Sequence, residues 1–368
     1  MKITDLKVQL IRRDLSEMPE VEMSHGGISF VKQMMEVPII RIFTDEGVEG
    51  TSCGRGGLPL AQYVASLKQL LLGEDPLYVE RIWQKIWSMN RILHQPQPAL
   101  GPVDVALWDI VGKVADLPIY QLLGAYRDKV RAYASSTQYP DIESYVKEAL
   151  ECRAKGFSAY KLHVSGIPNE DLAVCRGVRE AVGDEMILMH DPVGLYDRRQ
   201  ALMVGRELEK LNFYWLEEPI QDTDIEGLLG LCNALDIPIA SLEVLPGNLY
   251  TRAQYIAKGA VDIVRSDTCY NGGITPLKKI ASLCEAFGIN CEIHCCPNPW
   301  MNAANLHVMC SIKNCDFYEW MVPEGIWDFG VKEAIKFDDE GFVHVPKKPG
   351  LGLEINWEYI DSHTIQTL

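Results

Sequence analysis

Seven polar or ionisable side chains, spaced almost evenly along the chain, limit its possible folds more than any other feature of the sequence. Each lies at or near the end of a short apolar run, and neighbours in the series are 24 to 30 residues apart. One strand–helix unit of a (β/α)8 barrel has about this length, since roughly 250 residues form eight units. The seven residues are Lys161, Asp191, Glu217, Glu243, Asp267, His294 and Glu319.

Eight apolar runs in the later part of the chain fit the strands of such a barrel. Helical spacers such as 142–155 and 201–211 separate most of them, and this alternation is the pattern of an α/β fold with a parallel sheet. Because barrel active sites lie at the C-terminal ends of the strands, the seven polar residues would surround one mouth. The alternative explanation is that strand ends are polar simply because loops begin there. The runs are 131–136, 159–164, 186–190, 213–217, 237–242, 262–265, 290–294 and 316–321.

The first 125 residues follow a different pattern. A β-rich run at 37–43 precedes helical spacing over 77–91, and a second helix is predicted at 103–114. After residue 330, loops and short strands replace the barrel pattern. We therefore predict three parts, an α+β domain at 1–125, a barrel domain at 126–330 and a tail at 331–368.

Composition argues against several classes of protein. The 368 residues carry a formal net charge of −16, which repels phosphate backbones and speaks against a nucleic-acid partner. No apolar run approaches the ~20 residues of a membrane span, and the first residues lack the apolar core of a signal peptide. The cysteine count is 11, an odd number in a long chain without an export signal, which favours reduced thiols in the cytoplasm.

Three carboxylates end three consecutive strand candidates. Asp191, Glu217 and Glu243 would repel one another strongly in one mouth, and a hard divalent cation would remove that conflict. Mg²⁺ takes oxygen ligands in octahedral geometry, whereas zinc would be expected to have His or Cys among its ligands. The alternative is three separately solvated acids.

Candidate proton-transfer groups lie on opposite sides of the predicted barrel, Lys161 and His163 on one side and His294 on the other. Lys161 and His163 are two residues apart on one strand, so both side chains face the same way. Like-charge repulsion should lower the pKa of either cation and tune one of them towards a general base. Asp267 and His294 end consecutive runs, where a carboxylate would fix the imidazole tautomer and stabilise its protonated form. Otherwise, both histidines would be satisfied core residues.

Several motifs resemble the mandelate racemase-like branch of the enolase superfamily, and the resemblance covers almost the whole chain. The first motif is similar to the helix between that family's capping domain and its barrel, and the others to its fourth-, fifth- and sixth-strand motifs. They are DVALWDIVGK at 104–113, WLEEP at 215–219, PIASLE at 238–243, and Asp267 followed by GGIT at 272–275.

The resemblance implies a fold, a cofactor and partners. The fold is a modified (β/α)7β TIM barrel with an N-terminal α+β capping domain that the C-terminal tail completes. The cofactor is one Mg²⁺ held by Asp191, Glu217 and Glu243, because the first acid of the fourth-strand motif is the ligand, which selects Glu217 over Glu218. The resemblance also implies a small-molecule carboxylate substrate and a homo-oligomer.

The second strand departs from the family pattern. The family usually has Lys-x-Lys with the second lysine as base, but this chain has Lys161-Leu-His163, so His163 occupies the base position. Lys161 would lower the pKa of its neighbour or hold the substrate carboxylate, and which of the two takes the proton stays open. Glu319, if protonated, would donate to the same carboxylate. His294, held by Asp267, would act as the acid on the opposite face of the substrate.

The implied reaction starts with removal of the proton α to a carboxylate. We expect dehydration of an aldonate or aldarate to a 2-keto-3-deoxy acid through an enediolate, with racemisation or epimerisation of a 2-hydroxy acid as the alternative. Glycine-rich loops that carry His25 and Arg55 favour a polyhydroxylated substrate, and Arg55 would suit a second carboxylate. Trp300 would supply an apolar wall, which favours the alternative. We predict that His25, Arg55 and Trp300 contact the substrate.

A hypothesis from another class rests on the cysteines near His294. Soft thiolate ligands there could hold zinc or an iron–sulfur cluster, although no Cys-x-x-Cys pair occurs and buried cysteine is a common core residue. A barrel without activity that serves as a scaffold is a further alternative. These cysteines are Cys291, Cys295, Cys296, Cys310 and Cys315.

Overall fold

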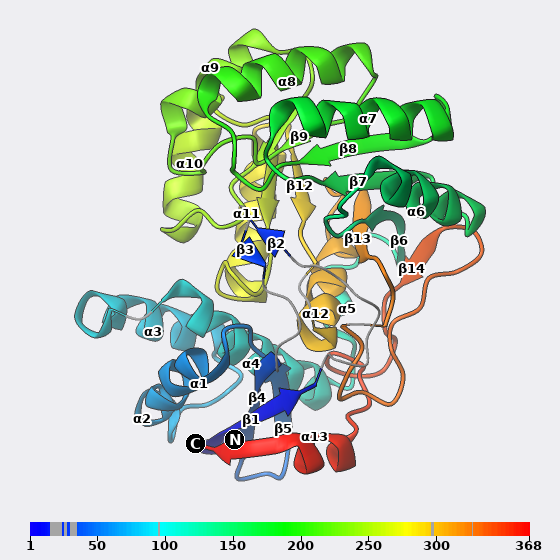
Figure 1. Cartoon of the computed structure of the whole chain (residues 1–368). Helices are drawn as coiled ribbons and strands as arrows, with labels where there is room; N and C mark the ends of the chain where they lie inside the picture. Colours follow the sequence, from blue (N-terminus) through cyan, green and yellow to red (C-terminus); the bar gives the residue numbers. More distant parts are fainter. Residues whose placement is uncertain (15–23, 26–27, 30–34, 95, 296–297, 326) are drawn as a thin grey trace.

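The computed structural model describes residues 1–14, 24–25, 28–29, 35–94, 96–295, 298–325 and 327–368, and it has two parts (Figure 1). The larger part is a curled sheet of parallel strands in the order β12-β11-β10-β9-β8-β7-β6-β13, with β14 added antiparallel to β6. Its strands are β6 (Lys129–Ser135), β7 (Ala159–His163), β8 (Ile187–Asp191), β9 (Leu216–Glu217), β10 (Ile239–Ser241), β11 (Ile263–Ser266), β12 (Asn290–Ile293), β13 (Phe317–Met321) and β14 (Phe342–His344).

Helices connect consecutive strands and cover the outside of the curled sheet (Figure 1). Their starts are written in the sequence: Asp141 caps α6 by accepting from the Ser144 N–H, and Asp197 and Gln200 form a capping box on α8. The helices are α6 (Ile142–Ala154), α7 (Pro168–Val182), α8 (Arg198–Lys210), α9 (Ile225–Ala234), α10 (Asn248–Lys258), α11 (Ile274–Ala286) and α12 (Pro299–Met309).

The smaller part is an antiparallel sheet in the order β15-β1-β4-β5 with helices against it. The C-terminal strand pairs with the N-terminal strand, so the two ends of the chain meet in one sheet (Figure 1). Its elements are β1 (Ile3–Arg13), β4 (Met35–Thr44), β5 (Glu49–Cys53), α1 (Gly57–Ser66), α2 (Lys68–Leu71), α3 (Val79–Leu93), η1 (Gln97–Ala99), α4 (Leu100–Ala115), α5 (Ile119–Leu122), α13 (Trp357–His363) and β15 (Thr364–Thr367). A separate two-stranded sheet pairs β2 (Ser24–His25) with β3 (Ile28–Ser29).

Helix α4 joins the two parts through buried carboxylates. Asp104 accepts a hydrogen bond from the Thr275 N–H at 3.0 Å, at the start of α11. Asp109, five residues further along α4, accepts hydrogen bonds from the backbone N–H groups of Thr51 and Leu351 at 2.9 and 3.0 Å. One helix therefore contacts β5, the barrel and the tail, which fixes the smaller part over the barrel.

The interior of the barrel is layered. A lower layer is apolar, and residues two positions further along the same strands form a charged layer above it, because side chains alternate along a strand. Tyr133, Trp215 and Phe317 lie below, while Ser135, Glu217 and Glu319 lie above. The lower layer is Tyr133, Ala159, Met189, Trp215, Ala240, Ile263 and Phe317.

Within the described residues, no helix is both long and apolar enough for a bilayer crossing.

Candidate active site

A cavity of about 430 Å³ opens at the C-terminal ends of the barrel strands. Four of the residues predicted from the sequence line it: Arg55, His163, Glu243 and His294. Its wall also includes Glu218, which the sequence analysis set aside as a metal ligand, and four residues that it did not name, Gln138, Asp222, Tyr270 and Trp327.

Below the cavity, four buried side chains form a closed ring of alternating charge, which we call the charged quartet: Lys161, Glu217, Arg265 and Glu319. Lys161 Nζ lies 2.9 Å from Glu217 Oε1 and 2.9 Å from Glu319 Oε1. Arg265 closes the ring, with Nε 2.8 Å from Glu217 Oε1 and one terminal nitrogen 2.8 Å from Glu319 Oε2. All four side chains are at most 1% exposed, so the quartet is a neutral, desolvated floor.

The quartet determines which of its members stay charged. Burial opposes the charge on Lys161, but Glu217 and Glu319 outweigh burial and raise its pKa well above the ordinary value. Burial likewise opposes the charge on Glu319, yet Lys161 and Arg265 hold the pKa of this carboxyl well below its usual range. This arrangement therefore favours the ionised form of Glu319, whereas the predicted role as a donor to the substrate requires a protonated carboxyl.

Arg265 is a site residue that the sequence analysis missed. It lies on β11 two residues before Asp267, so the period of two along a strand places both on the inner face. Its buried guanidinium also reaches the Glu292 carbonyl at 3.3 Å. The sequence contains a signal for it: Arg265 is a cation in the apolar run 262–265 and precedes the predicted site residue Asp267 by two positions.

The three predicted metal ligands lie at the ends of β8, β9 and β10, but they are held by other partners. Lys161 Nζ contacts Asp191 Oδ2 at 3.1 Å as well as Glu217. Glu217 Oε2 accepts from the Trp215 indole N–H at 3.0 Å, and Glu243 lies 3.5 Å from His294 Nε2. In the part of the chain that the structure describes, no group of three or more His, Cys, Asp or Glu side chains is close enough to hold a metal ion.

Glu218 and Asp222 shape the wall beside Glu243. Asp222 accepts from the backbone N–H groups of Leu242 and Val244, and Glu218 accepts from the Glu243 N–H at 3.1 Å. Burial and neighbouring acids raise the pKa of Glu218 well above its ordinary value, and burial raises that of Glu243 to about 7 although His294 and Arg265 act against it. Carboxyl groups therefore crowd this side of the cavity and oppose one another's ionisation.

His163 is oriented by the backbone of the neighbouring strand end. Its Nδ1 lies 2.6 Å from the Ser136 carbonyl, which can only accept, so Nδ1 carries a proton and Nε2 is the functional nitrogen. Nε2 lies 3.1 Å from Asp191 Oδ2. Burial lowers the pKa of His163 and Lys161 lowers it as predicted, but Asp191 outweighs both, so the pKa of His163 is raised overall.

His294 forms a pair with Asp267 on the other side. Nδ1 lies 2.8 Å from Asp267 Oδ2, and the carboxylate is fully buried. Burial opposes the imidazolium, but Glu243 and the hydrogen bond that His294 donates to Asp267 raise the pKa of His294 to about 9. The ring is therefore protonated near neutral pH. Its Nε2 can donate, and this atom lies 3.5 Å from Glu243 Oε1 in the cavity wall.

The predicted substrate-contacting residues separate into three cases. Arg55 lines the cavity and donates to the Tyr270 hydroxyl. The backbone of His25 lies in β2, but its side chain falls outside the described part of the structure. Trp300 lies outside the cavity lining and is fully buried, and its indole N–H donates to Thr51 Oγ1 at 3.3 Å. The prediction for Trp300 is therefore wrong: it is a core residue between barrel and β5.

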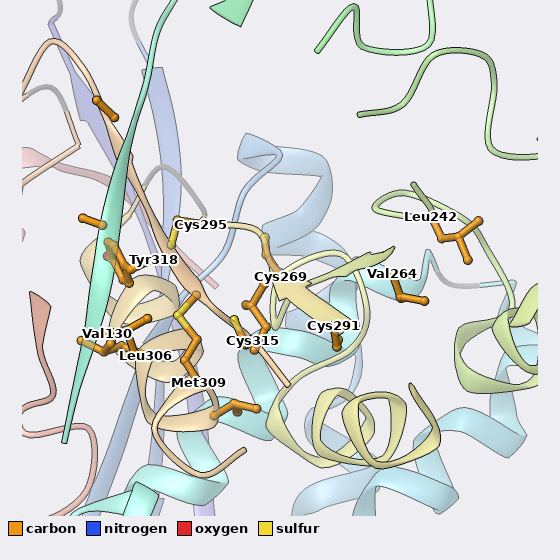
Figure 2. Packing of buried hydrophobic residues seen from close by; sticks show 14 of the residues in the cluster. Val130, Leu242, Val264, Cys269, Cys291, Cys295, Leu306, Met309, Cys315 and Tyr318 are labelled. Atoms are coloured by element: carbon orange, nitrogen blue, oxygen red, sulfur yellow. The ribbon is translucent and has the colours of Figure 1, made fainter. Parts of the chain in front are cut away.

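The cysteines near β12 are packing residues. Cys291 and Cys315 lie among buried apolar side chains such as Leu306 and Met309, and Cys295 lies beside Tyr318 (Figure 2). Burial raises the pKa of Cys295, so its thiol stays protonated. Cys296 lies outside the described residues.

Comparisons with known proteins agree with this architecture. Residues 144–359 match the family model described as enolase C-terminal domain-like, and residues 11–124 match that of the mandelate racemase / muconate lactonizing enzyme N-terminal domain. The chain is 32% identical over 335 residues to arabinonate dehydratase of Saccharolobus solfataricus, with 87% of this chain and 88% of that protein covered.

Two further relatives act on diacids, according to their names. The chain is 35% identical over 309 residues to L-talarate/galactarate dehydratase of Salmonella typhimurium, with 79% of this chain and 76% of that protein covered. A crystal structure of D-glucarate dehydratase from Agrobacterium tumefaciens, complexed with magnesium, superposes with a TM-score of 0.90 at 34% identity and covers 100% of both chains.

Proposed function

The chain belongs to the mandelate racemase / muconate lactonizing enzyme family within the enolase-like fold, and from this premise we propose that it dehydrates an acid sugar to a 2-keto-3-deoxy acid. Named dehydratases among its relatives support the reaction class. The observation that carries the proposal is the pair of differently supported histidines, His163 and His294, in the wall of one cavity.

His163 is the base in this proposal. Its Nδ1 proton is committed to the Ser136 carbonyl, so Nε2 is the atom that accepts the proton from the α-carbon. Lys161 is a poorer candidate, because its ammonium is 1% exposed and contacts Asp191, Glu217 and Glu319. This burial favours His163 over Lys161, a choice that the sequence left open.

His294 is the acid. As the α-proton leaves, the electron pair moves into the enediolate, and its collapse expels the β-hydroxyl. The imidazolium of His294 gives its Nε2 proton to that oxygen, which departs as water. Asp267 keeps the ring protonated and oriented through Nδ1. The enol that remains tautomerises to the 2-keto acid.

The carboxylates fit a hard divalent cation by their chemistry. Asp191, Glu217 and Glu243 come from successive strand ends, offer only oxygen donors, and adjoin the carboxyl groups that crowd around Glu218, whose mutual repulsion a cation would relieve. We propose Mg²⁺ as the cofactor, one per site; when bound, it supplies charge stabilisation for the substrate carboxylate as the α-carbon loses its proton. The chain's own cations, Lys161 and Arg265, support the ligand Glu217 from below.

A racemase or epimerase remains the second candidate, because a base and an acid on two sides of a cavity could also exchange the α-proton. The polar lining, with Gln138, Glu218 and Arg55, favours a polyhydroxylated substrate and thus elimination. We also propose a homo-oligomer, from the family resemblance, and a cytoplasmic location, from the odd number of cysteines; light scattering and cell fractionation would check them.

The test is a screen of aldonates and aldarates with Mg²⁺, in which semicarbazide absorbance detects the 2-keto acid. At least one acid sugar should yield keto acid, and chelation should abolish the activity until Mg²⁺ is returned. Optical inversion with α-deuterium incorporation and no keto acid would establish the racemase instead. Full activity of Glu217→Ala would contradict the assigned ligand set.

A further inference from the structure

Tyr270 lies in the cavity wall, where the barrel meets the smaller part of the molecule. It follows β11 by four residues and lines the cavity together with Arg55 and His294. Its hydroxyl accepts a hydrogen bond from Arg55, which comes from the loop after β5. Its carbonyl accepts from the Gln97 side chain at 3.1 Å, and Gln97 in turn accepts from the Gly247 N–H at 3.2 Å. Two side chains of the smaller part therefore hold both ends of this residue.

The same residue supports the acid of the proposed reaction. The Tyr270 ring lies nearly parallel to the His294 imidazole, with centroids 5.7 Å apart and an interplanar angle of 27°. Its backbone N–H donates to Asp267 Oδ1 at 2.6 Å, while Asp267 Oδ2 contacts His294 at 2.8 Å. The carboxylate is thus held on one oxygen by Tyr270 and used on the other by His294.

Arg55 is suited to an anionic oxygen by its chemistry. A guanidinium presents a planar fork of donors that matches a carboxylate, and a phenol hydroxyl accepts from that fork without neutralising its charge. The guanidinium carbon lies 5.6 Å from the Tyr270 ring centroid, so the ring also supports its orientation. Because Arg55 reaches the cavity from the other part of the chain, it can meet the end of a substrate whose α-carbon lies by the histidines.

We propose that Tyr270 is a positioning residue with two separable effects, and this proposal rests on the proposed dehydratase function. Its hydroxyl orients Arg55 to receive the far carboxylate of a diacid substrate, which makes an aldarate the preferred class. Its ring and backbone N–H hold the Asp267–His294 pair in place for proton donation. The first effect concerns substrate affinity, and the second concerns turnover.

The first test measures binding and needs no turnover. Calorimetry in Mg²⁺ buffer compares glutarate with its monoamide, neither of which carries a hydroxyl that can leave. The wild type should bind glutarate about ten-fold more tightly, and Tyr270→Phe or Arg55→Met should each remove that preference while binding of the monoamide is unchanged. The double variant should lose no more than either single variant, because both disrupt one contact. Tyr250→Phe, on the exposed side of α10, is the matched control and should behave as wild type.

The second test separates the two effects in the aldarate reaction. Tyr270→Phe keeps the ring, so its KM should rise about ten-fold with kcat within two-fold of wild type. Tyr270→Ala removes the ring as well, and its kcat should fall on the order of 10²-fold.

Three results would overturn the inference: no diacid preference in the wild type, wild-type affinity of Tyr270→Phe for glutarate, or additive losses in the double variant. Failure of the proposed function looks different, since the wild type would then release no keto acid from any acid sugar while the glutarate measurements would still decide the role of Tyr270.

Discussion

The two histidines of the cavity are the same residue type with opposite supports, and their comparison gives a physical reason for the roles of base and acid that we propose for them. His163 has a neutral carbonyl behind its ring, and the carboxylate that raises its pKa, Asp191, contacts the front nitrogen Nε2. His294 has the carboxylate of Asp267 behind its ring, at Nδ1. Asp267 contacts Nδ1 of His294, away from the cavity, so its contact remains when substrate enters. Asp191 contacts Nε2 of His163, the nitrogen that must also reach the substrate, so substrate competes with this contact.

Removal of either imidazole should give the largest effect and should separate the two roles. We expect His163→Asn and His294→Asn each to lower kcat on the order of 10³-fold, within the usual range for general acid–base groups. Only His294→Asn should still exchange the substrate α-proton with deuterium from solvent, followed by NMR. If His163→Asn exchanges and His294→Asn does not, the two assignments are reversed.

Removal of the Asp267 charge beside the His294 ring should give the second-largest loss of activity. Asp267→Asn keeps an oxygen for the Tyr270 N–H but loses the charge that holds the proton on His294, so kcat should fall on the order of 10²-fold. The α-proton exchange rate should stay near that of wild type, because His163 is untouched. Loss of exchange along with turnover would show that the two sides are not independent.

A smaller effect is expected from loosening the backbone around His163. The Tyr145 hydroxyl donates to the His163 carbonyl at 2.6 Å and accepts from the Tyr139 N–H at 3.0 Å. Tyr145→Phe leaves both groups without this partner, so the exchange rate should drop a few-fold and stability by roughly 1–3 kcal/mol. Tyr139→Phe, which removes a hydroxyl bonded to Glu148 instead, is the control. An exchange rate equal in both variants would remove Tyr145 from the support of the base.

The smallest effect on activity is predicted for a buried carboxylate that has no imidazole beside it. Burial raises the pKa of Asp104 to about 7, although hydrogen bonds from Thr275 act against burial. The folded state therefore keeps a proton that the unfolded state loses near pH 4, so this group favours folding at low pH and its contribution is lost as pH rises to 7. A pKa that is higher by one in the folded state than in the unfolded state corresponds to about 1.4 kcal/mol of stability.

Asp104→Asn should consequently flatten the pH dependence of stability while leaving kcat nearly unchanged. Urea unfolding at pH 5 and pH 8 gives the comparison, and the wild type should lose more stability between these values than the variant. Equal losses in the two proteins would assign the pH dependence to other groups.

The sequence predicted the polar ring of the barrel well because strand ends and side-chain alternation are local properties. The eight strands observed, β6 to β13, coincide with the eight apolar runs, and two members of the evenly spaced series, Glu243 and His294, line one cavity. Side-chain partners depend on neighbouring strands, which a local pattern does not contain. For this reason the sequence indicates neither that Lys161 and Arg265 favour the ionised form of Glu319 nor that Trp300 donates to Thr51 instead of lining the cavity.

The charged quartet restricts how this enzyme can change during evolution. Its four members are buried above an apolar layer, so loss of one charge leaves an unpaired neighbour that water cannot reach. A single substitution at Lys161, Glu217, Arg265 or Glu319 is therefore costly, whereas loss of a cation and an anion together keeps the floor neutral. Variants that keep the fold should therefore exchange these positions in pairs, and a library that varies them one at a time would miss those variants.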